Sequence, residues 1–145
     1  MITERENNGT ALALGYAGLL PFIAFSSAVI AGVTIGPVDP LAALIAYGAC
    51  IASFLGGIAW GAAVERHGPG LEYAWSVLPS LVAWAALLMP VTPALLTLMA
   101  AFAAALVQDF ANLRTGRLPP WFWRLRVQLT LVVVVTLAVT LGSIG

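Results

Sequence analysis

Lysine is absent from the 145 residues, and charged residues of all kinds make up only 8% of the chain. A soluble domain usually carries about a quarter charged residues. Hydrophobic residues account for 61% of the sequence, and the mean hydropathy is +1.01. A folded domain of this size leaves much of its chain exposed, so it cannot hide this much apolar surface from water. The composition predicts an integral membrane protein and excludes a soluble globular domain.

Cysteine and histidine are also scarce. Cys50 is the single cysteine and His67 the single histidine, so neither an intrachain disulfide nor a metal-ligand spacing is available. The six arginines do not form the basic face that nucleic-acid binding requires. Acids, histidines or a serine with a base do not cluster in the sequence, as intramembrane catalysis normally requires. We therefore expect no cofactor, no metal, no nucleic-acid partner and no enzymatic activity.

Five apolar runs approach the roughly 20 residues that a helix needs to cross about 30 Å of hydrocarbon. They cover residues 11–33, 41–64, 71–89, 94–112 and 121–144. The segments between them are rich in proline and glycine, which end helices. The runs are apolar on every face and lack the alternation of a membrane barrel. We predict an all-α membrane protein, a compact bundle of five transmembrane helices in one domain over residues 1–145.

The arginines give the bundle an orientation. With five spans, all of them fall on one side: Arg5, Arg66, Arg114, Arg117, Arg124 and Arg126. Because arginine and lysine concentrate in cytoplasmic loops, the N-terminus is predicted to be cytoplasmic and the C-terminus periplasmic. An alternative is that the first run is a signal peptide cleaved near Ser26-Ser27-Ala28. Cleavage would leave four spans with the same loop orientation.

Small residues recur along the second run. Two stripes with a spacing of four residues contain Ala49, Ser53, Gly57 and Gly61, and Gly48, Ala52 and Gly56. Such spacing lets helix backbones approach closely in a membrane. We predict a helix-packing face that includes Ala49, Ser53, Gly56, Gly57 and Gly61. Its partner is either another helix of this chain, which we favour, or another protein.

Two of the predicted helices contain a proline. Pro21 and Pro79 each remove one backbone hydrogen bond, to the carbonyls of Ala17 and Trp75 respectively, and each freed carbonyl needs another partner in lipid. We predict a static kink at each proline. The alternative is a hinge, or a bent wall around a cavity.

Asp109 is the acidic residue that lies deepest in an apolar run. A carboxylate at the bilayer centre costs about 2.5–3.5 kcal/mol on insertion scales, and less near the surface. The fifth helix begins on the same side and brings Arg126 to a similar depth. We predict an Asp109–Arg126 ion pair that joins the last two helices, with Arg124 as the second choice of partner. A proton or ligand site at Asp109 is the functional alternative.

Four blocks of the sequence carry a family resemblance. They are Leu14-Gly15 with Gly18-Leu19 and Pro21-Phe22; Tyr47-Gly48-Ala49 with Ser53-Phe54-Leu55-Gly56-Gly57 and Trp60-Gly61; Ser76-Val77-Leu78-Pro79-Ser80-Leu81 with Ala83-Trp84; and Pro120-Trp121-Phe122 with Leu125-Arg126 and Leu129-Thr130. The chain resembles an uncharacterised family of small bacterial membrane proteins that includes the mitochondrial transmembrane protein sixty-nine. The resemblance implies a multi-pass protein of the bacterial inner membrane and supplies no reaction or catalytic residue. Phe122 departs from the tyrosine expected there.

Three functions follow from these observations. The first, which we favour, is a non-catalytic accessory subunit or assembly factor of a larger membrane complex, respiratory or otherwise energy-transducing. Its partners would be the lipid bilayer and either another membrane protein or further copies of this chain. The second is a small, oligomeric transporter or channel with Asp109 as the ionisable site. The third is a membrane enzyme acting on lipid or quinone.

Overall fold

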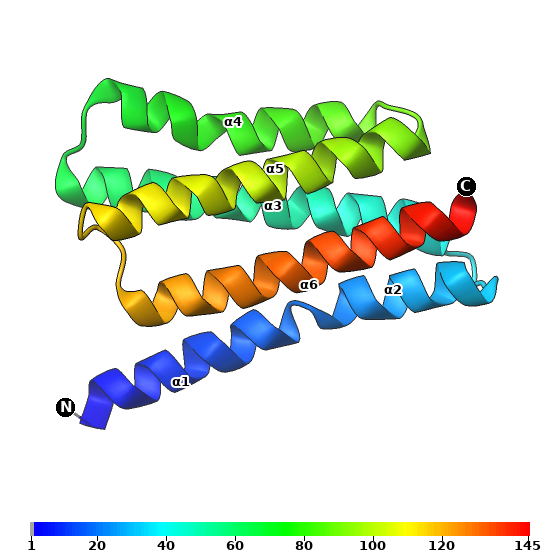
Figure 1. The fold of residues 1–145 in the computed structure, drawn as a ribbon, viewed down its shortest axis with the longest axis horizontal. Coiled ribbons are helices and arrows are strands. Elements are labelled where there is room, and N and C mark those ends of the chain that lie inside the picture. Colours follow the sequence, from blue (N-terminus) through cyan, green and yellow to red (C-terminus); the bar gives the residue numbers. More distant parts are fainter. Residues whose placement is uncertain (1) are drawn as a thin grey trace.

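A computed structural model describes the backbone of residues 2–145 and the side chains of residues 8–145, so the side chain of Arg5 lies outside the described part. Its helices are α1 (Ile2–Ala17), α2 (Leu20–Ala31), α3 (Pro40–Arg66), α4 (Gly70–Leu87), α5 (Val91–Arg114) and α6 (Pro120–Ile144). They run side by side as a bundle of rods, with α1 and α2 in line as one broken rod (Figure 1). Residues 2–145 contain one isolated bridge, between Ile35 and Val38, and no strand. The predicted all-α bundle is confirmed.

Local sequence explains where the helices begin and end. Asp39 caps α3, because its carboxylate accepts a hydrogen bond from the Leu41 N–H at 3.0 Å, and Pro40 occupies the first turn, where its missing N–H is harmless. His67 ends the same helix with a left-handed φ of 53°. Gly116, with a φ of 72°, turns the chain between α5 and α6. The other predicted ends differ from the observed ones by only a few residues.

The first predicted span, 11–33, corresponds to the stretch Asn8–Ala31, which is long and apolar enough to cross a membrane, but it is two helices and not one continuous helix. The chain leaves the helical path at Gly18 and Leu19, and α2 stops at Ala31, where Gly32 adopts a left-handed φ of 66°. Pro21 lies in the first turn of α2, so it follows a break and does not kink a continuous helix. The Gly18 carbonyl accepts a hydrogen bond from the Tyr47 hydroxyl of α3 at 2.9 Å. A neighbouring helix thus satisfies part of the interrupted backbone.

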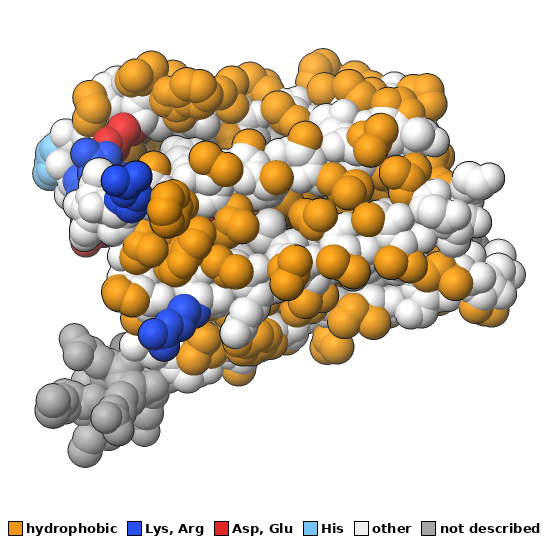
Figure 2. All heavy atoms as spheres, viewed as in Figure 1, with side chains coloured by type: hydrophobic (Ala, Val, Ile, Leu, Met, Phe, Trp, Pro, Cys, Tyr) orange, Lys and Arg blue, Asp and Glu red, His pale blue; other side chains and the backbone are white. Residues whose placement is uncertain are grey.

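Four stretches of the described chain are long and apolar enough to cross a membrane: Asn8–Ala31, Pro40–Arg66, Val91–Arg114 and Pro120–Ile144. The chain is therefore a multi-pass membrane protein. Large apolar side chains such as Leu14, Phe54, Trp84, Val107 and Leu131 lie exposed on the surface, as lipid contact requires. Apolar side chains cover much of the face shown in Figure 2. Helix α4 is shorter and is not among the four, yet it lies along α3 as one of the rods of the bundle (Figure 1). A fifth crossing by α4 stays a prediction.

The two ends of the bundle differ in polarity. The start of α1, the α3–α4 loop and the α5–α6 loop lie at one end, and the α2–α3 loop, the α4–α5 loop and the C-terminus lie at the opposite end (Figure 1). On the face shown in Figure 2, the arginine and histidine side chains gather at the first end, which we call the arginine end. The buried apolar core includes Leu44, Leu95, Leu98 and Leu137. These residues belong to the half of the bundle away from the arginine end.

Candidate functional site

A cavity of about 160 Å³ lies between α3, α4, α5 and α6 at the arginine end. Apolar side chains from α3 and α4 form part of its wall. Its charged lining residues are Arg66, Glu72, Asp109, Arg117 and Arg126, and its uncharged polar lining residues are Ser76, Gln108 and Asn112. Although apolar atoms form most of its surface, its charged groups stand out in a bundle this apolar; we call it the polar cavity and take it as the strongest candidate site in the described part of the chain.

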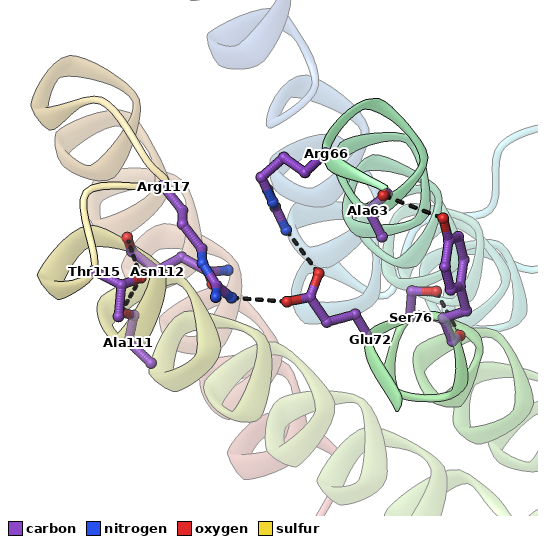
Figure 3. Close-up of polar contacts among 9 residues, drawn as sticks. Ala63, Arg66, Glu72, Ser76, Ala111, Asn112, Thr115 and Arg117 are labelled. Carbon is purple, nitrogen blue, oxygen red and sulfur yellow. Dashed lines mark hydrogen bonds and ion pairs between the residues drawn. The ribbon is translucent and has the colours of Figure 1, made fainter. Parts of the chain in front are cut away.

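Glu72 connects three segments at the mouth of this cavity. One carboxylate oxygen accepts from Arg66 Nη2 at 3.0 Å, and the other accepts from Arg117 Nη1 at 2.8 Å. Figure 3 shows the carboxylate between the two guanidinium groups, which come from the end of α3 and the α5–α6 loop. All three side chains are partly exposed, so solvent weakens each pair. The bridge holds the two loops of the arginine end together.

Asp109 and Arg126 form a second, deeper ion pair. Arg126 Nε donates to Asp109 Oδ2 at 2.7 Å, and Arg126 is only 6% exposed. The predicted partners therefore meet and join α5 to α6, while the second choice, Arg124, lies exposed on α6 and does not line the cavity. The Asp109 side chain is 19% exposed, so the arginine is the partner that loses nearly all of its hydration, and the direct charge-assisted hydrogen bond offsets that loss. Whether Asp109 has a role beyond this pairing stays a prediction.

Arg126 also lies between two cavities. The second, of about 130 Å³, is almost entirely apolar and is bounded by the break between α1 and α2 and by α3, α5 and α6. Thr130 lines it, and the buried hydroxyl of Thr130 has no hydrogen-bond partner among the described residues. Leu55 and Arg126 line both cavities. The Arg126 side chain thus borders both a polar space and an apolar one.

The small residues of α3 divide between two faces. Ala49 and Gly56 are buried, together with Gly48 and Ala52. A Cβ on Gly56 would lie 2.5 Å from the Ser76 carbonyl oxygen, so this glycine lets α3 and α4 come into close contact. The predicted inclusion of Gly57 and Gly61 in the same inner face is wrong. Both are exposed, and a Cβ on either would meet nothing within 4 Å.

Ser53 is half-buried between these two faces. The sequence pattern failed here because α3 carries small residues on both sides. A spacing of four residues identifies a stripe without saying which stripe faces inward.

Pro79 belongs to the wall of the polar cavity. Helix α4 continues through it, and its ring would lie 3.5 Å from a Cβ on Gly56. The Ser76 hydroxyl donates to the Tyr73 carbonyl at 2.7 Å (Figure 3) and not to Trp75, whose carbonyl Pro79 leaves without its usual partner. Pro79, Gly56 and Ser76 therefore lie together in the wall of the cavity. Whether this segment moves stays a prediction.

The bridge made by Glu72 was not predicted from the sequence. A negative charge in the first turn of α4 suits the helix dipole, which by itself gives Glu72 a reason to be there. The sequence did contain a relevant feature. Glu72 is predicted on the same side of the membrane as all the arginines, so cations lie within its reach. Its two partners lie 6 and 45 residues away in the sequence. Only the folded chain selects them from the available arginines.

Comparison with known proteins gives a consistent family. Residues 7–142 match the family described as "Protein of unknown function (DUF3429)". Transmembrane protein 69 from Xenopus tropicalis is 41% identical over 88% of this chain, and the mouse protein of the same name is 34% identical over 90%. The matches cover 51% and 55% of those proteins, so the chain spans about half the length of the relatives it matches. No solved structure matches the chain.

Proposed function

We propose that this chain, which belongs to the DUF3429 family, is a non-catalytic accessory subunit or assembly factor of a larger membrane complex. The observation that carries the proposal is the outer face of α3. There Gly57 and Gly61 leave a shallow strip on which no other helix of the described chain packs. A helix from another membrane protein fits such a strip. The identity of the complex, respiratory or otherwise energy-transducing, belongs to the same proposal.

Packing against a partner helix would lower the energy of this face. Glycine in a helix interior is about 1 kcal/mol less favourable than alanine, and lipid offers these two residues nothing in return. A second helix would gain close backbone contact and dispersion energy along the strip, which is the main drive for helix association in membranes. Cys50 and Phe54 are exposed on the same helix. Each lies seven residues before one of the two glycines, so their side chains continue the same face of α3 and offer a partner apolar contact.

Gentle-detergent purification followed by native gel electrophoresis and mass spectrometry tests the proposal. The expected result is migration as a complex larger than the 15.1 kDa chain, with a second membrane protein in the band. Gly57→Leu and Gly61→Leu fill the strip and should release the chain. Ala103→Leu, at an exposed position on α5, is the matched control and should leave the complex intact.

Recovery of the unmodified chain as a lone monomer would count against the proposal. A band containing this chain alone at a multiple of its mass would replace the foreign partner with self-association.

The membrane location is part of the proposal. The arginine end faces the cytoplasm of a bacterial cell, and the chain lies in the inner membrane, because positive loops stay on that side. Single cysteines are introduced by Thr115→Cys or Gly145→Cys in a Cys50→Ala background. A membrane-impermeant maleimide applied to intact cells should label position 145 and spare position 115. Labelling of both positions would contradict this topology.

A second candidate function is transport, favoured by the polar cavity that Asp109 and Arg126 line. An intramembrane carboxylate next to a cavity is a common element of proton and ion pathways. Reconstitution into liposomes with a pH-sensitive dye would then show a flux that Asp109→Asn abolishes. A flux that persists unchanged in this variant would remove Asp109 from any such role.

A further inference from the structure

The net charge of the polar cavity and its unused hydrogen-bond donors indicate which class of ligand it would bind. Three arginines and two carboxylates line it, which leaves one positive charge in excess. The inner pair of Asp109 and Arg126 is balanced, so the excess belongs to the partly exposed Arg66, Glu72 and Arg117 at the mouth, where it attracts an anion although water also screens it. A ligand with one negative charge balances this cavity, whereas a dianion or a neutral molecule does not.

Arg126 supplies the donors for such a ligand. A guanidinium carries five N–H donors in a planar fork. Of the three guanidinium nitrogens of Arg126, only Nε has a hydrogen-bond partner within residues 8–145, and that partner is Asp109. Its two terminal nitrogens have none. A fork with unused donors matches two oxygens of one phosphate or carboxylate group. The Asp109 contact fixes the guanidinium, so the fork is held in place before the ligand arrives.

The remaining lining selects among anions. Gln108 and Asn112 carry amide N–H groups that donate to phosphate oxygens as readily as to carboxylates. Arg66 and Arg117 stand at the mouth, each using one donor on Glu72. Positive side chains at several positions around one space suit a tetrahedral anion with four oxygens better than a planar carboxylate with two. The cavity volume of about 160 Å³ is many times the roughly 10–15 Å³ that one water needs on the same measure, which leaves room for a hydrated headgroup.

We propose that this cavity binds a monoanionic phosphodiester, with the free fork of Arg126 as its main ligand. The apolar part of the wall, which includes Ile58, Trp75 and Pro79, and the location at the charged end of a membrane bundle suit a phospholipid headgroup. A phosphodiester whose remaining headgroup is uncharged, such as phosphatidylglycerol, balances the excess charge. A zwitterionic headgroup such as phosphatidylcholine does not. The proposal does not depend on the outer face of α3.

Native mass spectrometry of the purified full chain in detergent measures the binding. The probes are short-chain phosphatidylglycerol, short-chain phosphatidylcholine and the water-soluble headgroup glycerophosphoglycerol. The unmodified chain should bind phosphatidylglycerol at least about tenfold more tightly than phosphatidylcholine, as expected for hydrogen bonds to a charged group. Equal binding of the two lipids would overturn the proposal.

The variants separate the fork from overall charge. Arg126→Lys keeps a cation for Asp109 but removes the fork, and it should abolish the preference for phosphatidylglycerol. Arg124→Gln removes one positive charge from an exposed neighbour that does not line the cavity, and it should keep the preference within about twofold, as screened surface charges do. An equal effect of the two variants would mean that surface charge attracts the lipid, and the site would be abandoned.

Two further readouts keep the test decisive. Because a misfolded Arg126→Lys chain would also lose binding, Arg117→Gln at the exposed mouth is measured beside it, with circular dichroism and gel filtration on every variant. Arg117→Gln should weaken phosphatidylglycerol binding severalfold in a folded chain, and no effect there would contradict the assigned cavity.

Competition by glycerophosphoglycerol at similar concentration would assign the site to soluble phosphodiesters. Competition only by the lipid would assign it to the membrane.

Discussion

The two halves of this bundle are stabilised by different means. Away from the arginines, leucine and phenylalanine side chains from α2, α3, α5 and α6 interdigitate, and a buried Ser26–Thr140 hydrogen bond of 2.7 Å joins α2 to α6. At the arginine end, ion pairs span a polar cavity that the side chains leave open. Packed halves tolerate little change in volume, whereas polar halves tolerate little change in charge. The difference separates a structural half from a half that has room for a ligand.

The largest expected effect belongs to the inner ion pair. Asp109→Ala leaves the buried Arg126 charge without its carboxylate and should destabilise the chain by about 3–5 kcal/mol. Unfolding titrations in mixed micelles measure this loss. The double variant Asp109→Leu with Arg126→Met replaces the pair with apolar groups of similar size, and it should recover most of the stability. Equal losses in the single and double variants would show that the loss does not come from an unpaired buried charge on Arg126.

A cavity made in the packed half should come next. Leu98 is fully buried, so Leu98→Ala should cost about 2–5 kcal/mol, the usual range for a core leucine truncated to alanine. The same titration compares it with Leu96→Ala. Leu96 lies two residues earlier on α5, faces the opposite side of the helix and is 50% exposed. A small loss at Leu96 and a large one at Leu98 are expected. Similar losses at the two positions would mean that α5 packs differently.

The two faces of α3 provide a third comparison. Gly56→Ala places a methyl group against the Ser76 carbonyl and should force α3 and α4 apart, at about 1–3 kcal/mol. Gly57→Ala meets open space and should be neutral or stabilising by up to about 1 kcal/mol, because alanine favours the helix. Thermal unfolding of the pair in detergent gives the sign of each change. A loss at Gly57 in the isolated chain would contradict its outward position.

The smallest effect is expected at the mouth of the cavity. Glu72→Gln weakens two partly exposed ion pairs, each worth about 1 kcal/mol or less. The loss in unfolding free energy should shrink further as salt is raised, since salt screens exposed pairs. The Asp109→Ala loss should change little over the same range of salt. A salt-independent loss at Glu72 would mean that the bridge is more buried than the structure shows.

Local features of the sequence predicted the class of protein and one contact of the site. The length of the apolar runs and the grouping of arginines needed only counting along the chain. The Asp109–Arg126 contact was predictable because both residues lie a similar depth into neighbouring antiparallel helices. Depth in the bilayer is nearly a one-dimensional property, and sequence position determines it once the spans are assigned.

Properties that depend on direction around a helix axis were decided by the tertiary structure. In α3 the apolar and small residues occur on every side, so no polar face tells Gly56 from Gly57. Only contact with α4 selects the inner face. The two partners of Glu72, the break before α2 and the unused donors of Arg126 likewise depend on how the helices rotate and tilt against one another. In lipid every side of a helix is in an apolar solvent, so the sequence determines which segments enter the membrane, and packing alone determines which sides meet.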